Sequence, residues 1–124
     1  MAKIVHDDVL DGAFDVLDQA NLMIACSAQP TTRTEAVTTY ALADATMTVN
    51  TDYTKANGDT NGRKVTVAAR SAQLVDTSGT ATHIALVDGS RLLYVTTCTS
   101  QPLTANLINT VNFPAWDVEI ADPT

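Results

Sequence analysis

Two alternating segments around a turn constrain the fold of this chain most strongly. Residues 80–87 and 91–99 alternate in side-chain character and flank the turn sequence Asp88-Gly89-Ser90. Two such segments joined by a short loop that contains glycine predict a β-hairpin. Apolar residues lie on both faces of each arm, which is typical of a strand covered on both sides. We therefore expect this hairpin at the centre of a sheet or sandwich.

The rest of the chain after residue 21 also favours strands. Twenty of the 124 residues are threonine, a β-branched residue that suits strands. Further strands are predicted at residues 22–26, 45–50, 63–69 and 110–120. Pro114 within the last of these suggests an edge position or a bulge. Residues 31–44 fit either a helical turn or an extended segment. The sequence thus predicts a mainly β protein, an antiparallel β-sandwich or barrel-like domain over residues 22–120.

One amphipathic helix is predicted before the strands, at residues 7–20. Leu10, Ala13, Phe14 and Leu17 recur at helical spacing, and Val9 and Val16 widen this apolar stripe. Asp7 or Asp8 is expected to cap the helix, and Asp15 and Asp18 are expected to face solvent. The acidic residues of this helix form a candidate interface for a basic patch on a partner: Asp7, Asp8, Asp11, Asp15 and Asp18.

Length and charge limit the possible classes of protein. The 124 residues fit a single domain, residues 1–124, with one core. Seven Lys and Arg against 14 Asp and Glu give a net charge of −7, which argues against nucleic acid as a partner. No apolar run approaches the ~20 residues of a membrane helix. The first residues do not resemble an export signal, so synthesis in the cytoplasm is expected.

Candidate catalytic groups are few. His6 and His83 are the two histidines, and neither lies in a metal-ligand or nucleophile–base pattern. Cys26 and Cys98 match no zinc spacing; two buried thiols are the expected state, with a disulfide between paired strands as the open alternative. Residues 57–62 have the composition of a calcium loop without its spacing. We expect no enzymatic activity, no metal and no cofactor.

Aromatic side chains near the C-terminus are the remaining candidates for contact with a partner. Phe113, Trp116 and Tyr94 are expected to serve either as core anchors or as interface residues. Phe113 and Trp116 therefore join the five helix aspartates as candidate interface residues.

Several segments together resemble a family of small proteins encoded among the virion genes of tailed phages and prophages. The resemblance covers residues 1–11, 26–32, 62–69, 78–88, 91–99 and 112–123, the last beginning Asn112-Phe113-Pro114-Ala115-Trp116. It supplies no catalytic residues. Residues 101–109 form a longer connection than a simple link between strands requires.

The resemblance implies a structural component of a phage particle. Its first expectation is a capsid decoration (cement) protein on the exterior of the head, with the major capsid protein and copies of itself as partners. The alternative is a structural protein of the neck, tail or fibre attachment. A module that binds host glycans is a weaker alternative.

Overall fold

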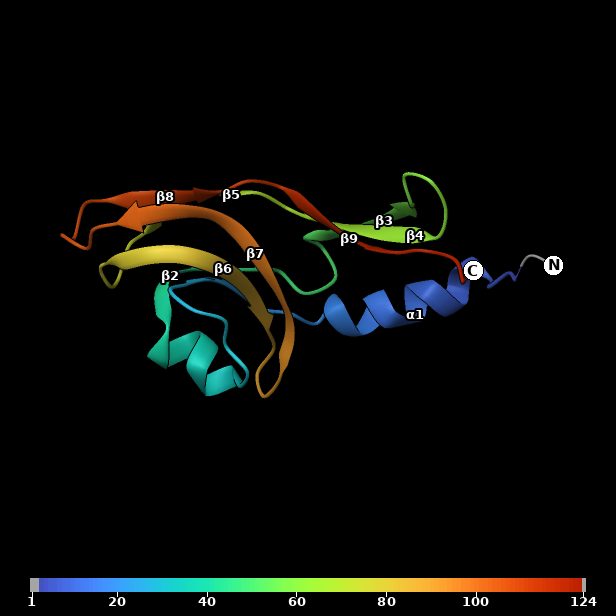
Figure 1. Cartoon of the computed structure of the whole chain (residues 1–124), viewed down its shortest axis with the longest axis horizontal. Helices are drawn as coiled ribbons and strands as arrows, with labels where there is room; N and C mark the ends of the chain where they lie inside the picture. The colour runs from blue at the N-terminus through green and yellow to red at the C-terminus, as the bar shows by residue number, and fades with distance from the viewer. Residues whose placement is uncertain (1–2, 124) are drawn as a thin grey trace.

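The computed structural model describes residues 3–123, and nearly half of them lie in antiparallel strands (Figure 1). The elements in chain order are α1 (Asp7–Leu17), β1 (Leu22–Cys26), a π-helical turn η1 (Glu35–Thr39), β2 (Ala41–Thr46), β3 (Tyr53–Asn57), β4 (Arg63–Val67), β5 (Arg70–Leu74), β6 (Gly79–Val87), β7 (Leu92–Leu103), β8 (Thr110–Phe113) and β9 (Trp116–Ile120). The predicted fold class, mainly β with one N-terminal helix, is confirmed.

The largest sheet has four strands in the order β2-β1-β6-β7. Strands β6 and β7 form the predicted hairpin, in which Leu86 pairs with Tyr94 and Ala85 with Val95. Of the two hairpin strands, β6 lies inside the sheet and β7 lies at its edge, so the expected central position holds for β6 alone. Strand β7 also continues through Leu103, so the first part of the long 101–109 connection is strand.

The turn of this hairpin is held by Asp88. Its carboxylate accepts hydrogen bonds from the backbone N–H of Ser90 (2.8 Å) and of Arg91 (2.5 Å). The Arg91 side chain forms an ion pair with the same carboxylate at 2.7 Å. These donors, the Ser90 N–H foremost, lower the pKa of Asp88 to about 2.

Asp88 is therefore expected to give the protein acid-sensitive stability. A carboxyl whose pKa is lowered by folding stabilises the folded state above its unfolded pKa, near 4. That stability is lost as the pH falls toward 2. Urea unfolding at about pH 5 and about pH 2.5 should show a larger loss for the wild type than for Asp88→Asn. Equal losses in the two proteins would contradict this role for Asp88.

Strands β4 and β5, paired with β9 and β8, form one bent ribbon, and β3 pairs with β4 as a third strand at one end. Val67 of β4 pairs with Trp116 of β9, and Arg70 of β5 pairs with Phe113 of β8. The same register therefore continues from the β4–β9 pair to the β5–β8 pair, across the break between these two arms of the ribbon. Pro114 lies at this break and has no N–H to donate to the ladder, which explains the interruption. The prediction of one uninterrupted strand over 110–120 is wrong for this reason, and the prediction of one strand over 63–69 overlooked the same bend. The edge position that Pro114 suggested is confirmed, because β8 and β9 each lie at the edge of their sheet.

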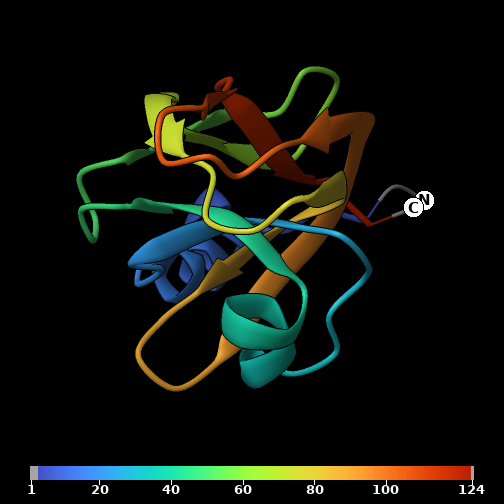
Figure 2. The ribbon, with the colours of Figure 1, turned by 90° about the vertical axis from the view of Figure 1, so that its left-hand side faces the viewer.

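The ribbon covers one face of the four-stranded sheet (Figure 2), and α1 packs beside it against β4 and β7. The main core lies between these layers, and its largest fully buried side chains are Phe14 of α1, Met23 of β1 and Leu86 of β6. A smaller core, around Ile24 and Cys26, lies on the opposite face of the sheet and packs against Val37 of η1. The arrangement is that of a sandwich with unequal layers.

Three predicted boundaries of the elements are corrected by the structure. Helix α1 ends at Leu17, not at residue 20, because the chain turns there and Ala20 is completely buried. His6, not an aspartate, caps this helix: its Nδ1 accepts a hydrogen bond from the Asp8 N–H at 3.1 Å. The strand predicted at 45–50 is β2 at Ala41–Thr46, which settles the open 31–44 segment as η1 followed by strand.

Candidate functional site

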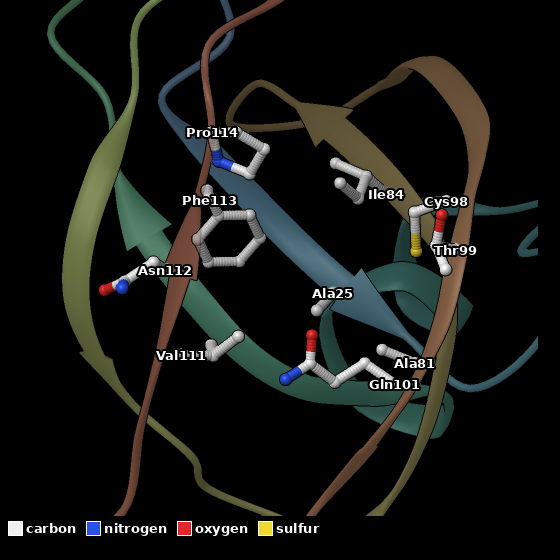
Figure 3. Close-up of a pocket in the computed structure, with 10 residues that line it drawn as sticks. All are labelled: Ala25, Ala81, Ile84, Cys98, Thr99, Gln101, Val111, Asn112, Phe113 and Pro114. Atoms are coloured by element: carbon white, nitrogen blue, oxygen red, sulfur yellow. The ribbon is translucent and has the colours of Figure 1, made fainter.

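An apolar cavity of about 220 Å³ lies between the four-stranded sheet and the ribbon. Cys98 and Thr99 of β7 border it on one side and Phe113 of β8 on the other (Figure 3). Ala25 and Ile84 form part of its floor. Its lining contains a thiol and two amides but no imidazole or carboxylate, so the cavity supplies no general base for a nucleophile.

The two cysteines are free thiols, Cys26 buried and Cys98 half-buried. Burial raises the pKa of Cys26 to about 11, with a smaller contribution from the nearby Cys98, and burial also raises the pKa of Cys98. Since the thiolate is the reactive form, burial of these side chains disfavours reaction at either sulfur. The structure thus has the two thiols that were expected, although Cys98 is less buried than predicted.

The aromatic candidates belong to the interior more than to the surface. Phe113 is 3% exposed and lies in the main core. Trp116 is half-buried; its ring stacks on Tyr94 with 5.9 Å between the centroids, and its N–H points at the Met23 sulfur, 3.4 Å away. Phe113 therefore anchors the fold, and Trp116 joins β9 to the four-stranded sheet.

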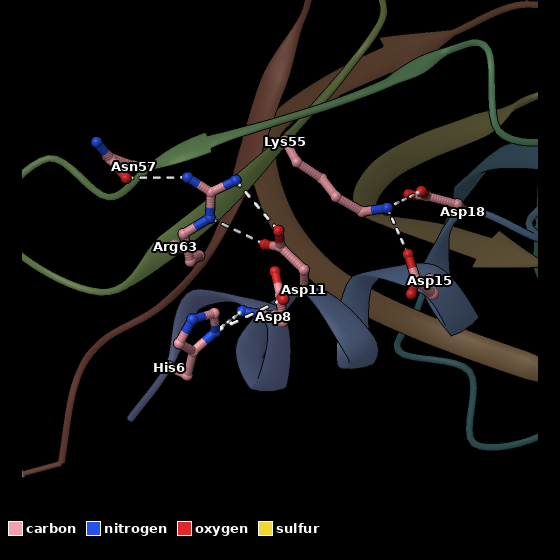
Figure 4. Close-up of polar contacts among 8 residues, drawn as sticks. All are labelled: His6, Asp8, Asp11, Asp15, Asp18, Lys55, Asn57 and Arg63. Carbon is pink, nitrogen blue, oxygen red and sulfur yellow. Dashed lines mark hydrogen bonds and ion pairs between the residues drawn. The ribbon is translucent and has the colours of Figure 1, made fainter. Parts of the chain in front are cut away.

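The middle of the acidic helix face pairs with a cation of the same molecule (Figure 4). Arg63 of β4 donates through Nε and one terminal nitrogen to the two carboxylate oxygens of Asp11, at 2.9 and 3.2 Å. A further bond to Asn57, at 2.9 Å, orients the guanidinium. The bonds to Asp11 raise the pKa of Arg63 further. Such a two-pronged ion pair fixes the helix to the β3–β4 hairpin.

The end of the same face pairs with Lys55 of β3. The Lys55 ammonium lies 2.5 Å from an Asp15 oxygen and 2.9 Å from an Asp18 oxygen (Figure 4). Asp18 is only 3% exposed, and its second oxygen has no hydrogen-bond partner. The hydrogen bonds that the Lys55 ammonium donates to these carboxylates, to Asp15 foremost, raise the pKa of Lys55. The expectation that Asp18 faces solvent is wrong, whereas Asp15 is exposed as predicted.

Asp7, Asp8 and Asp15 are the exposed members of the five candidate aspartates, and Asp7 and Asp8 lie at the start of α1. Asp15 pairs with Lys55, whereas within residues 3–123 neither Asp7 nor Asp8 forms an ion pair with a lysine or arginine. His6 lies 3.7 Å from Asp8. The part of the acidic face that is free to meet a basic partner is therefore limited to the first turn of the helix.

The outward face of α1 is apolar. Val9 is 65% exposed and Val16 46%, with the exposed Ala13 between them at helical spacing. An open groove of about 250 Å³ runs beside Ala13 and is lined further by side chains of β7 and β9, among them Tyr94 and Ile120. The sequence prediction placed Val9, Ala13 and Val16 in the buried stripe, and all three are exposed, so it missed this surface.

Comparisons with known proteins and searches for metal-ligand or membrane-spanning patterns do not assign a role to these surfaces. Comparison with protein-family models, curated proteins and solved structures finds no match for this chain. Over residues 3–123, no three His, Cys, Asp or Glu side chains gather as metal ligands would. None of the helices described for this chain has the length and apolar character needed to span a membrane. The functional proposal accordingly depends on the residues and their arrangement.

Proposed function

We propose that this protein is a non-enzymatic structural component of a tailed-phage virion, a capsid decoration protein on the outside of the head. The resemblance of its segments to the virion protein family supports this assignment. The single mainly β fold, with its helix fixed to a β-hairpin, suits a small part that is added to a larger shell.

The distribution of charge carries the proposal. Five cationic side chains form ion pairs with carboxylates of the same molecule: Lys55, Arg63, Lys64, Arg70 and Arg91. Other carboxylates stay exposed, including Asp7, Asp8, Asp44 and Asp76. The net charge of −7 is thus presented outward with few cations to offset it. Such a surface is repelled by packaged DNA, which favours the exterior of the capsid over its interior.

The stabilising mechanism in this proposal is multivalent burial of surface. Each copy would contact the major capsid protein on adjacent subunits and other copies of itself. A bound copy would have to break several interfaces together in order to leave, so weak individual contacts give firm attachment. Basic patches on the capsid protein are the expected partners of the exposed carboxylates at the start of α1.

Copy number in the virion tests the assignment. We expect this protein in a constant molar ratio to the major capsid protein, measured by quantitative mass spectrometry of purified particles. We also expect isolated heads stripped of the protein to rupture at lower temperature, with recovery when it is added back. A protein that binds only the neck, tail or fibres would instead be present in a few copies and stay with tails after heads and tails are separated.

A further inference from the structure

The exposed large apolar side chains of residues 3–123 fall into two groups. Ile4, Val9 and Val16 belong to α1 and the segment before it, whereas Leu74, Leu107 and Ile108 belong to the far end of the ribbon. Leu74 pairs with Thr110 at the base of the loop between β7 and β8, and that loop contains the other two. Figure 1 shows this loop and α1 at opposite ends of the long axis of the molecule. We call residues 104–109 the apolar loop.

The apolar loop is held in one shape by hydrogen bonds. The Asn106 side chain accepts from the backbone N–H of Ile108 (3.1 Å) and of Asn109 (2.8 Å). The Asn109 amide donates to the Thr104 carbonyl at 3.0 Å. This framework leaves Leu107 87% exposed and Ile108 79% exposed. Two aliphatic side chains are thus presented to solvent on a braced turn.

Leu107 has a backbone conformation that leucine rarely adopts. Its φ is +70°, in the left-handed region that favours glycine and asparagine. A leucine there costs about 1 kcal/mol, and its exposed side chain gains little burial within the molecule in return. Strain of this kind is typical of positions that contact a ligand or partner.

The groove beside α1 fits such a loop in size and charge. A cavity of about 150 Å³ holds a benzene molecule, so a groove of about 250 Å³ accepts one or two aliphatic side chains. Glu119 is the charged residue in the lining of the groove. Residues 104–109 carry no charge, so an acidic molecule can insert this loop into a second copy without placing like charges together.

We propose that copies of this protein associate head to tail, with the apolar loop of one copy seated in the groove between α1 and strands β7 and β9 of the next. The two surfaces differ and lie at opposite ends, so the contact is heterologous. Heterologous contacts extend into rings or open filaments and do not stop at a dimer. This inference concerns the purified protein and holds whatever its place in the virion.

Sedimentation velocity over a range of concentrations tests the proposal. The average mass of the wild type should rise from the 13.1 kDa monomer past the dimer between about 10 μM and about 1 mM. The double variant Leu107→Asn/Ile108→Asn places asparagine, which tolerates a positive φ, at position 107 and removes both aliphatic side chains. It should weaken association by about tenfold or more. Ala13→Gln fills the groove with a good helix former and should have the same effect. Ser90→Asn, an exposed change in the β6–β7 turn, is the matched control and should associate like the wild type.

Mixing the two weakened variants gives the decisive measurement. The loop variant still has an intact groove, and the groove variant still has an intact loop. An equal mixture should therefore form a dimer that neither variant forms alone. Thermal unfolding of each variant confirms that it is folded. A wild type that stays monomeric, a wild type that stops at a dimer, or a mixture without a dimer would each overturn the proposal. Variants that bind capsids less well while the wild type is monomeric would assign the loop to the capsid protein instead.

Discussion

Replacing Phe14 with alanine should destabilise the protein by about 3–5 kcal/mol, the usual cost of removing a buried aromatic side chain. Phe14 is 1% exposed and is the largest side chain that α1 places in the main core. Its loss leaves a cavity between the helix and the sheets, because the surrounding structure relaxes only partly. The free energy of unfolding, measured by urea titration, gives the magnitude.

Val16→Ala on the same helix is the matched control for Phe14→Ala. Val16 is 46% exposed, so its truncation should change the free energy of unfolding by no more than about 0.5 kcal/mol. The two substitutions share the helix and the replacing residue and differ mainly in burial. Equal losses would mean that α1 is not packed on the sheets as described.

The second large effect is expected from Lys55→Met. This change leaves the carboxylate of Asp18 buried without its cation, and removing one partner of a buried ion pair costs about 3 kcal/mol or more. Methionine keeps most of the aliphatic stem of lysine, so the loss reports on charge and not on packing. The same urea titration measures it.

Two further variants separate this effect from a general cost of losing a lysine. Lys64→Met removes a cation from the Asp59 carboxylate, which is 71% exposed, and should cost no more than about 1 kcal/mol. Adding Asp18→Asn to Lys55→Met removes the buried charge and should restore part of the stability. The account fails if Lys64→Met is as costly as Lys55→Met, or if Asp18→Asn restores nothing.

The regular elements of this fold could be predicted because their signals are local. The helical spacing of Leu10, Phe14 and Leu17 identifies the buried stripe of α1, and alternation around Asp88-Gly89-Ser90 identifies the β6–β7 hairpin. Strand β5 was missed because four of its five residues are Arg, Ser, Ala and Gln, with little alternation or β propensity.

The surfaces could not be predicted in the same way, because long-range packing determines them. Lys55 and Arg63 lie some 40 and 50 residues after the aspartates that they pair with, and nothing near α1 signals either partner. A helical stripe also shows which residues share a face but not how wide the covering layer is. The sheets cover Phe14 and leave Val9 and Val16 exposed.

The pairs Val67–Trp116 and Arg70–Phe113 keep one register across the break in the ribbon, and this has a consequence for how such a sequence can evolve. A single inserted residue at Ala115 would turn every side chain of β9 to the opposite face, moving Val118 out of the core. An insertion in the facing connection, at Ala68 or Ala69, would restore the pairing of the two arms. Length changes at these two connections should therefore be inherited in pairs, although they lie about 45 positions apart in the chain.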